Sequence, residues 1–524
     1  MCGVQSPWGD EVVEGEYGGH PGLVYRQRPR TFAHLLFGVE RWAQRPFLVQ
    51  GDRRITFGGF FSAVAAARER LTAAGVGRGD RVMLLAYNSP DWVLTLVAIW
   101  SVGAVPVLGN RWWSERETAH CMAVVAPRAV VTDAPGLVAG CDVPVLDIAG
   151  FAYCFDATDT PATISGPDDE EDAAVILFTS GSTGMPKAVE LPFRSVVANQ
   201  QNVLARARQL PHVIATDGPQ AVNLISTPLF HIGAFATMIT QILTGGRIVF
   251  NTGRFDPTQV LELIESERIQ RWGAVPTMAA RLLEHPDFEA RDLSSLRAFP
   301  LGGAPVPPVL LERLAARLPQ LRGRGMVNTW GMTEGGGFFT MATGADLERF
   351  PTTVGRPFPT VELRIDSPDD GKGEILVRSP SMMLRYVGVD DGTLDADGWL
   401  RSGDLGHIND EGYLFIDGRS KDMVIRGGEN IACPHVEAAL MRHPDVVEAA
   451  AIGLPHPELG EELAAVVVHR PGGPVPTEEN LTAHMAGEVA YFAVPTRWCI
   501  RSEPLPTVGT EKIDKRGLAA EFTG

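Results

Sequence analysis

The segment with the clearest capacity for chemistry is a loop of hydroxyls and glycines that ends in a lysine. Its residues are Thr179, Ser180, Gly181, Ser182, Thr183, Gly184, Met185, Pro186 and Lys187. It follows the apolar run 174–177, which is typical of a buried strand, so the loop is expected to leave the end of a strand. Hydroxyls and closely spaced backbone N–H groups bind anions, and Lys187 adds a positive charge. The loop predicts a phosphate site; a plain Ser/Gly surface loop is the alternative from this segment alone.

The obvious rival for such a loop is the nucleotide-binding pattern GxxxxGK[ST]. Here the lysine follows Pro186 and precedes Ala188, so the spacing fails. Proline also lacks the N–H group that a helix start would donate to phosphate. A loop of that class is therefore excluded.

Further segments repeat, in order, the motifs of a known superfamily. They are Gly77-Arg78-Gly79-Asp80-Arg81-Val82, Gly302-Gly303-Ala304-Pro305, Asn328-Thr329-Trp330-Gly331-Met332-Thr333-Glu334, Ser402-Gly403-Asp404-Leu405, Gly418-Arg419-Ser420-Lys421-Asp422, Arg426-Gly427-Gly428-Glu429-Asn430-Ile431 and Thr510-Glu511-Lys512-Ile513. With the loop at 179–187 they resemble the adenylate-forming superfamily of acyl- and aryl-CoA synthetases, peptide-synthetase adenylation domains and beetle luciferases. The resemblance covers about residues 30–518 and is strongest to free-standing fatty or aryl acyl-CoA ligases.

The resemblance implies that a carboxylate attacks the α-phosphate of ATP, giving acyl-AMP and pyrophosphate. Charge builds on the phosphate oxygens in the transition state, so fixed cations and donors there contribute most. By the family pattern the loop 179–187 holds the β- and γ-phosphates, and Thr333 hydrogen-bonds the α-phosphate. Glu334 is expected to hold Mg²⁺, a hard cation that prefers carboxylate oxygen. A helix cap is the ordinary alternative for a Thr-Glu pair.

The same resemblance assigns the nucleoside contacts. Asp404 is expected to accept from the ribose hydroxyls, and Arg419 is the second ribose contact. Trp330 stands where the family has an aromatic ring over the base. The remaining predicted nucleotide contacts are small or flank these motifs: Gly302, Gly303, Ala304, Asn328, Gly331 and Met332. For the glycine pair at 302–303 a plain tight turn is the alternative.

Lys512 is the predicted catalytic lysine, because the family lysine at this position bridges the substrate carboxylate and the α-phosphate. A solvated surface charge is the ordinary reading of a lysine this near the C-terminus. In the family the small C-terminal domain rotates after adenylation. The rotation withdraws the lysine and presents the glycine pair, here Gly427 and Gly428, as one wall of the thiol's access tunnel. Lys421 stands at the hinge position.

The acid is expected to be hydrophobic. Residues 228–250 contain no acidic side chain, and an amino-acid substrate would leave its ammonium buried without a partner. An apolar, aromatic lining favours a fatty or aromatic acid. His231 matches the family's gating aromatic position and is a candidate gate or base, with a structural histidine as the alternative. The three glycines 335–337 indicate either room for the substrate or a flexible loop.

Coenzyme A is the expected acceptor, because no carrier domain follows Lys512. Alternatives are a ligase that passes its activated acid to a separate carrier protein or to an amine, including one that activates a non-carboxylic acid such as nitrous acid. A nucleotide-binding homologue without catalysis is a further alternative. The joint presence of Lys187, Glu334, Asp404, Arg419 and Lys512 argues against it.

Five positions depart from the family pattern. Ala188 replaces a common glycine, Pro192-Phe193 replaces Thr-His, and His435 stands where glutamate is common. Glu511 takes the place of the glycine before the catalytic lysine, where its negative charge could alter the reach of that lysine.

The elements that must position these residues are expected to be those of an α/β protein. Helical and strand patterns alternate over the first 330 residues, which predicts mainly parallel sheets covered by helices. Short alternating strands follow over 353–417 and predict a small β subdomain. We expect an N-terminal AMP-binding domain over 1–417 and a small, mobile α+β domain over 418–524.

Length and composition fit a soluble, multidomain protein. The chain has 524 residues, of which 45% are hydrophobic and 21% charged, and its net charge of −17 disfavours nucleic acid as a partner. Residues 92–110 carry no charge, but the glycine and proline inside them favour a buried helix and strand over a membrane span. The six cysteines show no metal spacing and the N-terminus no signal peptide. A cytoplasmic enzyme is expected, with monomer and homodimer left open.

Overall fold

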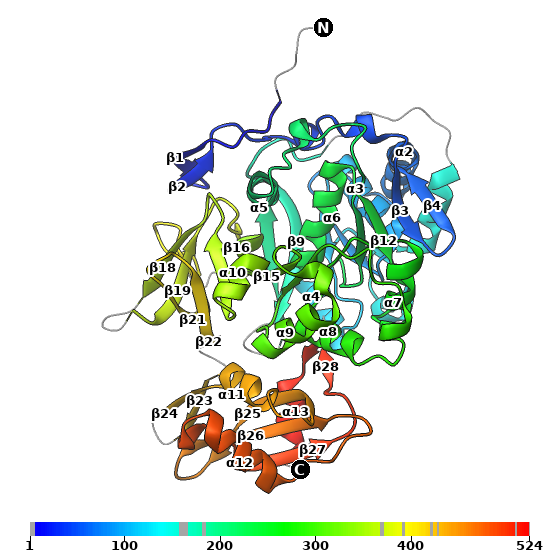
Figure 1. Ribbon diagram of the computed structural model, residues 1–524. Coiled ribbons are helices and arrows are strands. Elements are labelled where there is room, and N and C mark those ends of the chain that lie inside the picture. Colours follow the sequence, from blue (N-terminus) through cyan, green and yellow to red (C-terminus); the bar gives the residue numbers. More distant parts are fainter. Residues whose placement is uncertain are drawn as a thin grey trace.

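The computed structural model describes residues 6–156, 166–180, 185–366, 371–389, 393–419, 423–426, 429–508 and 511–522. Within these residues the protein is a mixed α/β structure. A large N-terminal domain lies above a small C-terminal one in Figure 1, and the three ribbon views agree on this division. The predicted α/β fold with a large and a small domain is confirmed; the predicted domain bounds stay predictions.

Two sheets of the large domain are mainly parallel. The first has the order β20-β10-β9-β6-β5-β7-β8, with β5 Arg81–Leu85, β6 Val105–Leu108, β7 Ala129–Thr132, β8 Val145–Asp147, β9 Ala173–Ser180, β10 Pro186–Pro192 and β20 Arg385–Tyr386. The second has the order β13-β11-β12-β3-β4, with β3 Pro46–Gln50, β4 Arg53–Thr56, β11 Val222–Ile225, β12 Arg247–Phe250 and β13 Arg271–Trp272. Their antiparallel pairs are β9–β10, β10–β20 and β3–β4.

The third sheet is mainly antiparallel and extends further than the predicted β subdomain. Its order is β14-β15-β16-β17-β22-β21-β19-β18, with β14 Phe299–Gly302, β15 Met326–Met332, β16 Gly337–Thr343, β17 Thr353–Pro357, β18 Glu362–Asp366, β19 Gly373–Arg378, β21 Leu400–Ile408 and β22 Leu414–Arg419. The strands predicted after residue 353 therefore continue a sheet that begins at β14. Because these strands form one sheet, the motifs at 302–304, 328–334, 404 and 419 all lie on this sheet or directly beside it.

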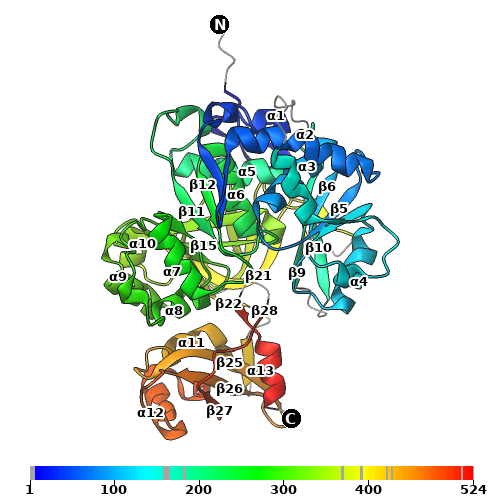
Figure 2. The same ribbon diagram turned by 90° about the vertical axis from the view of Figure 1, so that its right-hand side faces the viewer.

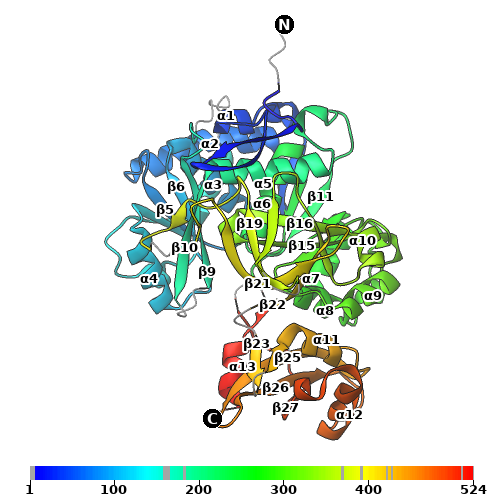
Figure 3. The ribbon, with the colours of Figure 1, turned by 90° about the vertical axis from the view of Figure 1, so that its left-hand side faces the viewer.

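Helices cover these sheets, as Figures 1 to 3 show. They are α1 Phe32–Leu35, α2 Phe57–Ala73, α3 Pro90–Val102, α4 Glu115–Val125, α5 Phe193–Arg206, α6 Ile232–Thr244, α7 Pro257–Ser266, α8 Pro276–Leu283, α9 Pro308–Arg317 and α10 Gly344–Arg349. An N-terminal hairpin, β1 Val12–Tyr17 and β2 His20–Tyr25, adds a small separate sheet.

The uncharged stretch 92–110 forms a buried helix and strand, as predicted. Ser89 caps α3 by accepting from the N–H of Trp92, and Pro90 occupies the first turn. Gly103 ends the helix at φ 81°, a conformation that glycine adopts readily. Almost every side chain of α3 is buried in the core of the large domain. Among the described residues, no helix combines the length and apolar character needed to cross a bilayer.

The C-terminal domain has a hydrophobic core of its own. Its sheet has the order β24-β23-β26-β25 with β27 beside β26, and the strands are β23 Met423–Arg426, β24 Glu429–Ala432, β25 Val446–His456, β26 Gly460–His469 and β27 Arg497–Arg501. Three helices, α11 Cys433–Leu440, α12 Glu478–Glu488 and α13 Lys515–Glu521, pack on it. A hairpin of β28 Thr507–Val508 and β29 Lys512–Ile513 reaches toward α8 at the junction of the domains (Figures 1 and 2).

Candidate active site

The predicted ribose residues meet in the third sheet. Asp404 on β21 pairs directly with Arg419 on β22, and the Arg419 Nε donates to Asp404 Oδ1 over 2.7 Å. The Trp330 Nε1 donates to the other oxygen, Oδ2, also over 2.7 Å. Asp404 is only 4% exposed. Both oxygens of a buried carboxylate are therefore fixed in place, which fits a rigid acceptor for two neighbouring hydroxyls.

The predicted phosphate and magnesium residues are linked by a tyrosine that the sequence did not indicate. The Lys187 Nζ lies 4.6 Å from the centre of the Tyr386 ring, and the Tyr386 hydroxyl donates to Glu334 Oε1 over 2.7 Å. Tyr386 reaches this place because β20 pairs with β10, which places Tyr386 opposite Val189. Lys187 thus lies over the electron-rich ring of Tyr386, and the buried carboxylate of Glu334 accepts a hydrogen bond from the hydroxyl of the same side chain.

The hairpin of β9 and β10 carries the phosphate loop. Thr179 on β9 pairs with Lys187 on β10, so the first and last residues of the predicted loop lie on adjacent antiparallel strands. Gly181, Ser182, Thr183 and Gly184 lie outside the described residues, as do Lys421, Gly427 and Gly428. Their predicted roles stay predictions.

The motif after β15 is shaped by close backbone packing. Thr333 and Glu334 lie in a 3-10 turn, Thr333–Gly335, directly after the strand that carries Asn328 and Trp330. A Cβ at Gly331 would lie 2.0 Å from the Gly337 carbonyl oxygen, so glycine is required there. The Asn328 Nδ2 donates to the Thr353 carbonyl over 3.0 Å, which gives this buried amide a structural bond within the sheet.

The glycines at the end of β14 satisfy two different constraints. A Cβ at Gly302 would lie 2.6 Å from Thr329 Oγ1, whereas Gly303 has φ 76°. Glycine is therefore needed at 302 because the Thr329 side chain approaches closely and at 303 because of its backbone conformation. Adenine contact here remains a prediction.

The prediction of open space beside the glycines 335–337 is wrong at their Cβ positions. A Cβ at Gly335 would lie 1.9 Å from the Phe339 ring, and one at Gly336 would lie 2.0 Å from Ser195 Oγ. At Gly337 it would meet Asn199 at 2.6 Å. Neighbouring side chains already fill the volume, so these glycines allow tight packing against β16 and α5.

His231 directly precedes α6, makes no side-chain capping bond to it, and remains uncharged. Burial, and then the positive charge of Lys512, lower the pKa of His231 to about 3. Its Nε2 is buried without a hydrogen-bond partner among the described residues, and its ring lies 4.6 Å from that of Phe230. A neutral imidazole of such low basicity suits a gate better than a base. The contribution of Lys512 to this shift supports a position of the predicted catalytic lysine near His231.

A small pocket marks the place where the two domains meet. Its wall includes Asn88, Trp112 and Phe230 from the large domain and Glu511 from the C-terminal hairpin. Phe230 connects it to His231, and Glu511 directly precedes Lys512. Residues that are far apart in sequence therefore converge at one opening.

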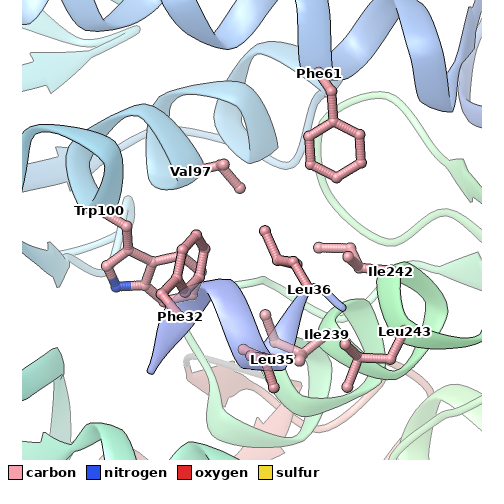
Figure 4. A pocket seen from close by; sticks show the side chains of 9 residues that line it. All are labelled: Phe32, Leu35, Leu36, Phe61, Val97, Trp100, Ile239, Ile242 and Leu243. Carbon is pink, nitrogen blue, oxygen red and sulfur yellow. The ribbon is translucent and has the colours of Figure 1, made fainter. Parts of the chain in front are cut away.

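A second cavity is entirely apolar and lies elsewhere. It is lined by Phe32, Leu35, Leu36, Phe61, Val97, Trp100, Ile239, Ile242 and Leu243, as Figure 4 shows, between α1, α2, α3 and the far half of α6. Its volume of about 10 Å³ holds at most one water-sized sphere. It has no polar group that could bind a nucleotide and is a packing defect of the core.

The comparisons with known proteins agree with this geometry. The model of the AMP-binding enzyme family matches residues 38–387, and that of the AMP-binding enzyme C-terminal domain matches residues 435–512. The chain belongs to the AMP-binding enzyme family. These matches cover both domains and every described predicted site residue except Asp404 and Arg419, which fall between them.

Relatives and solved structures match along nearly the whole chain. A feruloyl-CoA synthase of Amycolatopsis is 33% identical, covering 90% of this chain and 95% of its own. A long-chain fatty acid–CoA ligase of Mycobacterium tuberculosis is 31% identical, covering 96% and 98%. The o-succinylbenzoate coenzyme A synthetase of Bacillus subtilis, solved with ATP and magnesium, is 26% identical with a TM-score of 0.76 and covers 92% and 98%. The chain is an AMP-forming acid–thiol ligase that uses ATP, Mg²⁺ and coenzyme A.

Proposed function

We propose that this ligase activates a hydrophobic carboxylic acid, fatty or aromatic, to acyl-AMP and transfers the acyl group to coenzyme A. The observation that carries the proposal is the convergence at one site of Glu511, which directly precedes Lys512 in the C-terminal hairpin, with Phe230, whose ring lies against that of His231 in the large domain. This convergence supports Lys512 as the cation from the small domain that would meet the acid's carboxylate and the α-phosphate.

The described residues divide the work of the first step. Asp404 and Arg419 hold the ribose, and Lys187 neutralises phosphate charge that grows as the bond to pyrophosphate breaks. Thr333 donates to the α-phosphate, while Lys512 aligns the attacking carboxylate oxygen with the phosphorus. Glu334, oriented by the Tyr386 hydroxyl, offers the hard oxygen ligand that Mg²⁺ prefers. When bound, Mg²⁺ supplies positive charge beside the phosphates.

The apolar surroundings of His231 support the class of acid. Phe230 and Phe235 are buried at the start of α6, and the Phe338 ring lies 3.9 Å from where a Cβ of Gly233 would be. No carboxylate stands in residues 228–250 to hold a substrate ammonium. The feruloyl and long-chain fatty acids in the names of the relatives are both hydrophobic acids, which supports the same choice.

The second step uses the predicted movement of the C-terminal domain. Rotation about Lys421 withdraws Lys512 and brings Gly427 and Gly428 to the acyl-adenylate, where the thiolate of coenzyme A attacks the acyl carbon and AMP leaves. The proposed limits of the two domains are 1–417 and 418–524. The proposed cytoplasmic location is based on the sequence.

An exchange assay tests the proposal. ATP–pyrophosphate exchange is measured with a panel of fatty, aromatic and amino acids, and thioester formation is measured with coenzyme A, a phosphopantetheinylated carrier protein or a simple amine as acceptor. We expect exchange with hydrophobic acids and thioester with coenzyme A. Exchange only with amino acids, or transfer only to the carrier protein or amine, would contradict it.

A further inference from the structure

Side chains of helix α8 form hydrogen bonds with the hairpin that carries Lys512. Thr277 and Arg281 stand one turn apart and so share a face of the helix. The Thr277 hydroxyl donates to the Glu511 carbonyl oxygen over 2.6 Å, and the Arg281 Nη1 donates to Glu511 Oε2 over 2.6 Å. The residue immediately before Lys512 is therefore held through both its backbone and its side chain.

Arg281 also binds two other points of the C-terminal domain. Its Nη2 donates to the Leu505 carbonyl oxygen over 3.2 Å, and its Nε lies 3.5 Å from Glu448 Oε1. The other oxygen of Glu448 accepts from the Leu505 N–H over 2.8 Å. A guanidinium presents its donors in a rigid plane, so one side chain fixes β25, the approach to the hairpin and the hairpin itself relative to α8.

Glu511 adopts an unusual backbone conformation to make these contacts. Its φ is 61°, in the left-handed region that glycine adopts easily and glutamate does not. Its carboxylate also accepts from the Thr507 hydroxyl over 3.0 Å, within the same hairpin. The side chains of Arg281 and Glu511 are 24% and 17% exposed, so solvent screens the pair less than it screens a surface ion pair. The contacts of the Glu511 carboxylate offset the strain of this backbone conformation, which glycine would adopt without strain.

We propose that Arg281 is a positioning residue for the adenylation step, acting through Glu511 to hold Lys512 at the phosphate. The inference rests on the proposed role of Lys512. Rotation of the C-terminal domain must break every one of these contacts, because Arg281 stays with α8 while its partners leave. Arg281 therefore favours acyl-AMP formation and delays the change to the thioester-forming arrangement.

The test compares the two half-reactions in Arg281→Met and Glu511→Gln. We expect single-turnover formation of acyl-AMP to fall about 10-fold in each variant, because Lys512 is less well aligned, with KM for ATP unchanged. Thioester formation from supplied acyl-adenylate should stay at the wild-type rate or rise. Combining the two substitutions should cost little more than Arg281→Met alone, since both remove the Arg281–Glu511 ion pair. Arg281→Lys should recover part of the loss.

A matched control removes another ion pair across the same junction. The Arg470 Nη1 lies 3.2 Å from Glu284 Oε2, just beyond α8, and touches neither Glu511 nor the hairpin. Arg470→Met should leave adenylation within about twofold of wild type, as expected for a partly exposed pair. An equal loss in this control would show that general domain contact matters and would overturn the role of Arg281.

The outcomes separate this inference from the proposed function. If Lys512→Ala forms acyl-AMP at the wild-type rate, the proposed function of Lys512 fails. If Lys512→Ala loses adenylation but Arg281→Met and Glu511→Gln keep it, only the positioning role fails. Equal loss of both half-reactions in Arg281→Met and Glu511→Gln would also overturn the positioning role, because positioning of Lys512 affects adenylation alone.

Discussion

Two groups of polar contacts serve the site in different ways. The nucleotide cluster, formed by Asp404, Trp330, Arg419, Glu334 and Tyr386, is built on strands of the large domain and its two carboxylates are at most 6% exposed. The domain seam, formed by Thr277, Arg281, Glu448, Leu505 and Glu511, joins two domains, and the side chains of its two carboxylates, Glu448 and Glu511, are 11% and 17% exposed.

The difference in burial matches a difference in task. A group that must bind the nucleotide in both half-reactions is best held in place by the sheet that carries it, because the side chain is then already ordered when the nucleotide binds. A group that acts only in the first half-reaction must be released, so its contacts have to be individually modest and partly hydrated. The cluster is therefore predicted to be permanent and the seam to be made and broken in each cycle.

The largest effect is expected at Glu334. Glu334→Gln keeps the size of the side chain and the bond from Tyr386 but removes the charge that holds Mg²⁺. Acyl-AMP formation should fall on the order of 10²–10³-fold, and the Mg²⁺ concentration for half-maximal rate should rise. Pyrophosphate release in a single turnover measures this. A wild-type magnesium dependence would remove Glu334 from the metal site.

Asp404→Asn probes the permanence of the nucleotide cluster. The substitution removes a charge that accepts from both Trp330 and Arg419, and hydrogen bonds to a charged group are worth about 1.5–3 kcal/mol. KM for ATP should rise roughly 10–100-fold. The KM for supplied acyl-adenylate should rise similarly, because acyl-adenylate keeps the ribose. An effect on ATP alone would break the comparison between cluster and seam.

Tyr386→Phe sharpens the role of the residue that links Lys187 and Glu334. The ring and its contact with Lys187 remain, but the hydrogen bond to Glu334 is lost. Adenylation should slow about fivefold, the equivalent of about 1 kcal/mol. Tyr413→Phe is the control, since the Tyr413 hydroxyl donates to Asp346 over 2.7 Å away from the site. Equal effects of the two changes on adenylation would argue against a specific role.

The smallest effect concerns stability against pH. The pKa of His231 is lowered to about 3 in the folded protein, against about 6.5 in an unfolded chain. Above pH 6.5 both forms are neutral and the stabilisation is complete. As pH falls from 6.5 toward 3, the unfolded chain takes up a proton that the folded one refuses, so stability decreases.

Urea unfolding at pH 7 and pH 5.5 measures this effect. Between these values wild type should lose about 1 kcal/mol more unfolding free energy than His231→Asn, because one proton per molecule is linked to unfolding. If the adenylation rate of wild type shows an inflection near pH 6.5, His231→Asn should show the same inflection. Identical pH dependence of stability in the two proteins would mean that His231 titrates normally.

The sequence predicted the fold well, because the alternation of helical and strand patterns is local, whereas the roles of the charged site residues stay predictions. The apolar run at 174–177, for example, lies within the strand Ala173–Ser180. The motif carrying Asp404 and that carrying Arg419 met in register across one sheet. Such short motifs fix residue type and spacing together.

The remainder depends on contacts between distant segments. Tyr386 reaches Glu334 only because β20 adds to the first sheet beside β10, a pairing that no local pattern announces. Arg281 is an ordinary helix residue until a hairpin from the C-terminal domain docks on α8. The glycines 335–337 suggested room in sequence, yet side chains from Phe339, Ser195 and Asn199 fill that volume.

The most direct test of the division between cluster and seam is the pair of half-reactions in Lys512→Ala. Lys512 lies on the hairpin of the C-terminal domain, whereas the nucleotide cluster lies in the large domain and is untouched by the change. Acyl-AMP formation should fall on the order of 10²–10³-fold, while thioester formation from supplied acyl-adenylate and coenzyme A should stay within a few-fold of wild type. Equal loss in both half-reactions would contradict a lysine that serves only the first step.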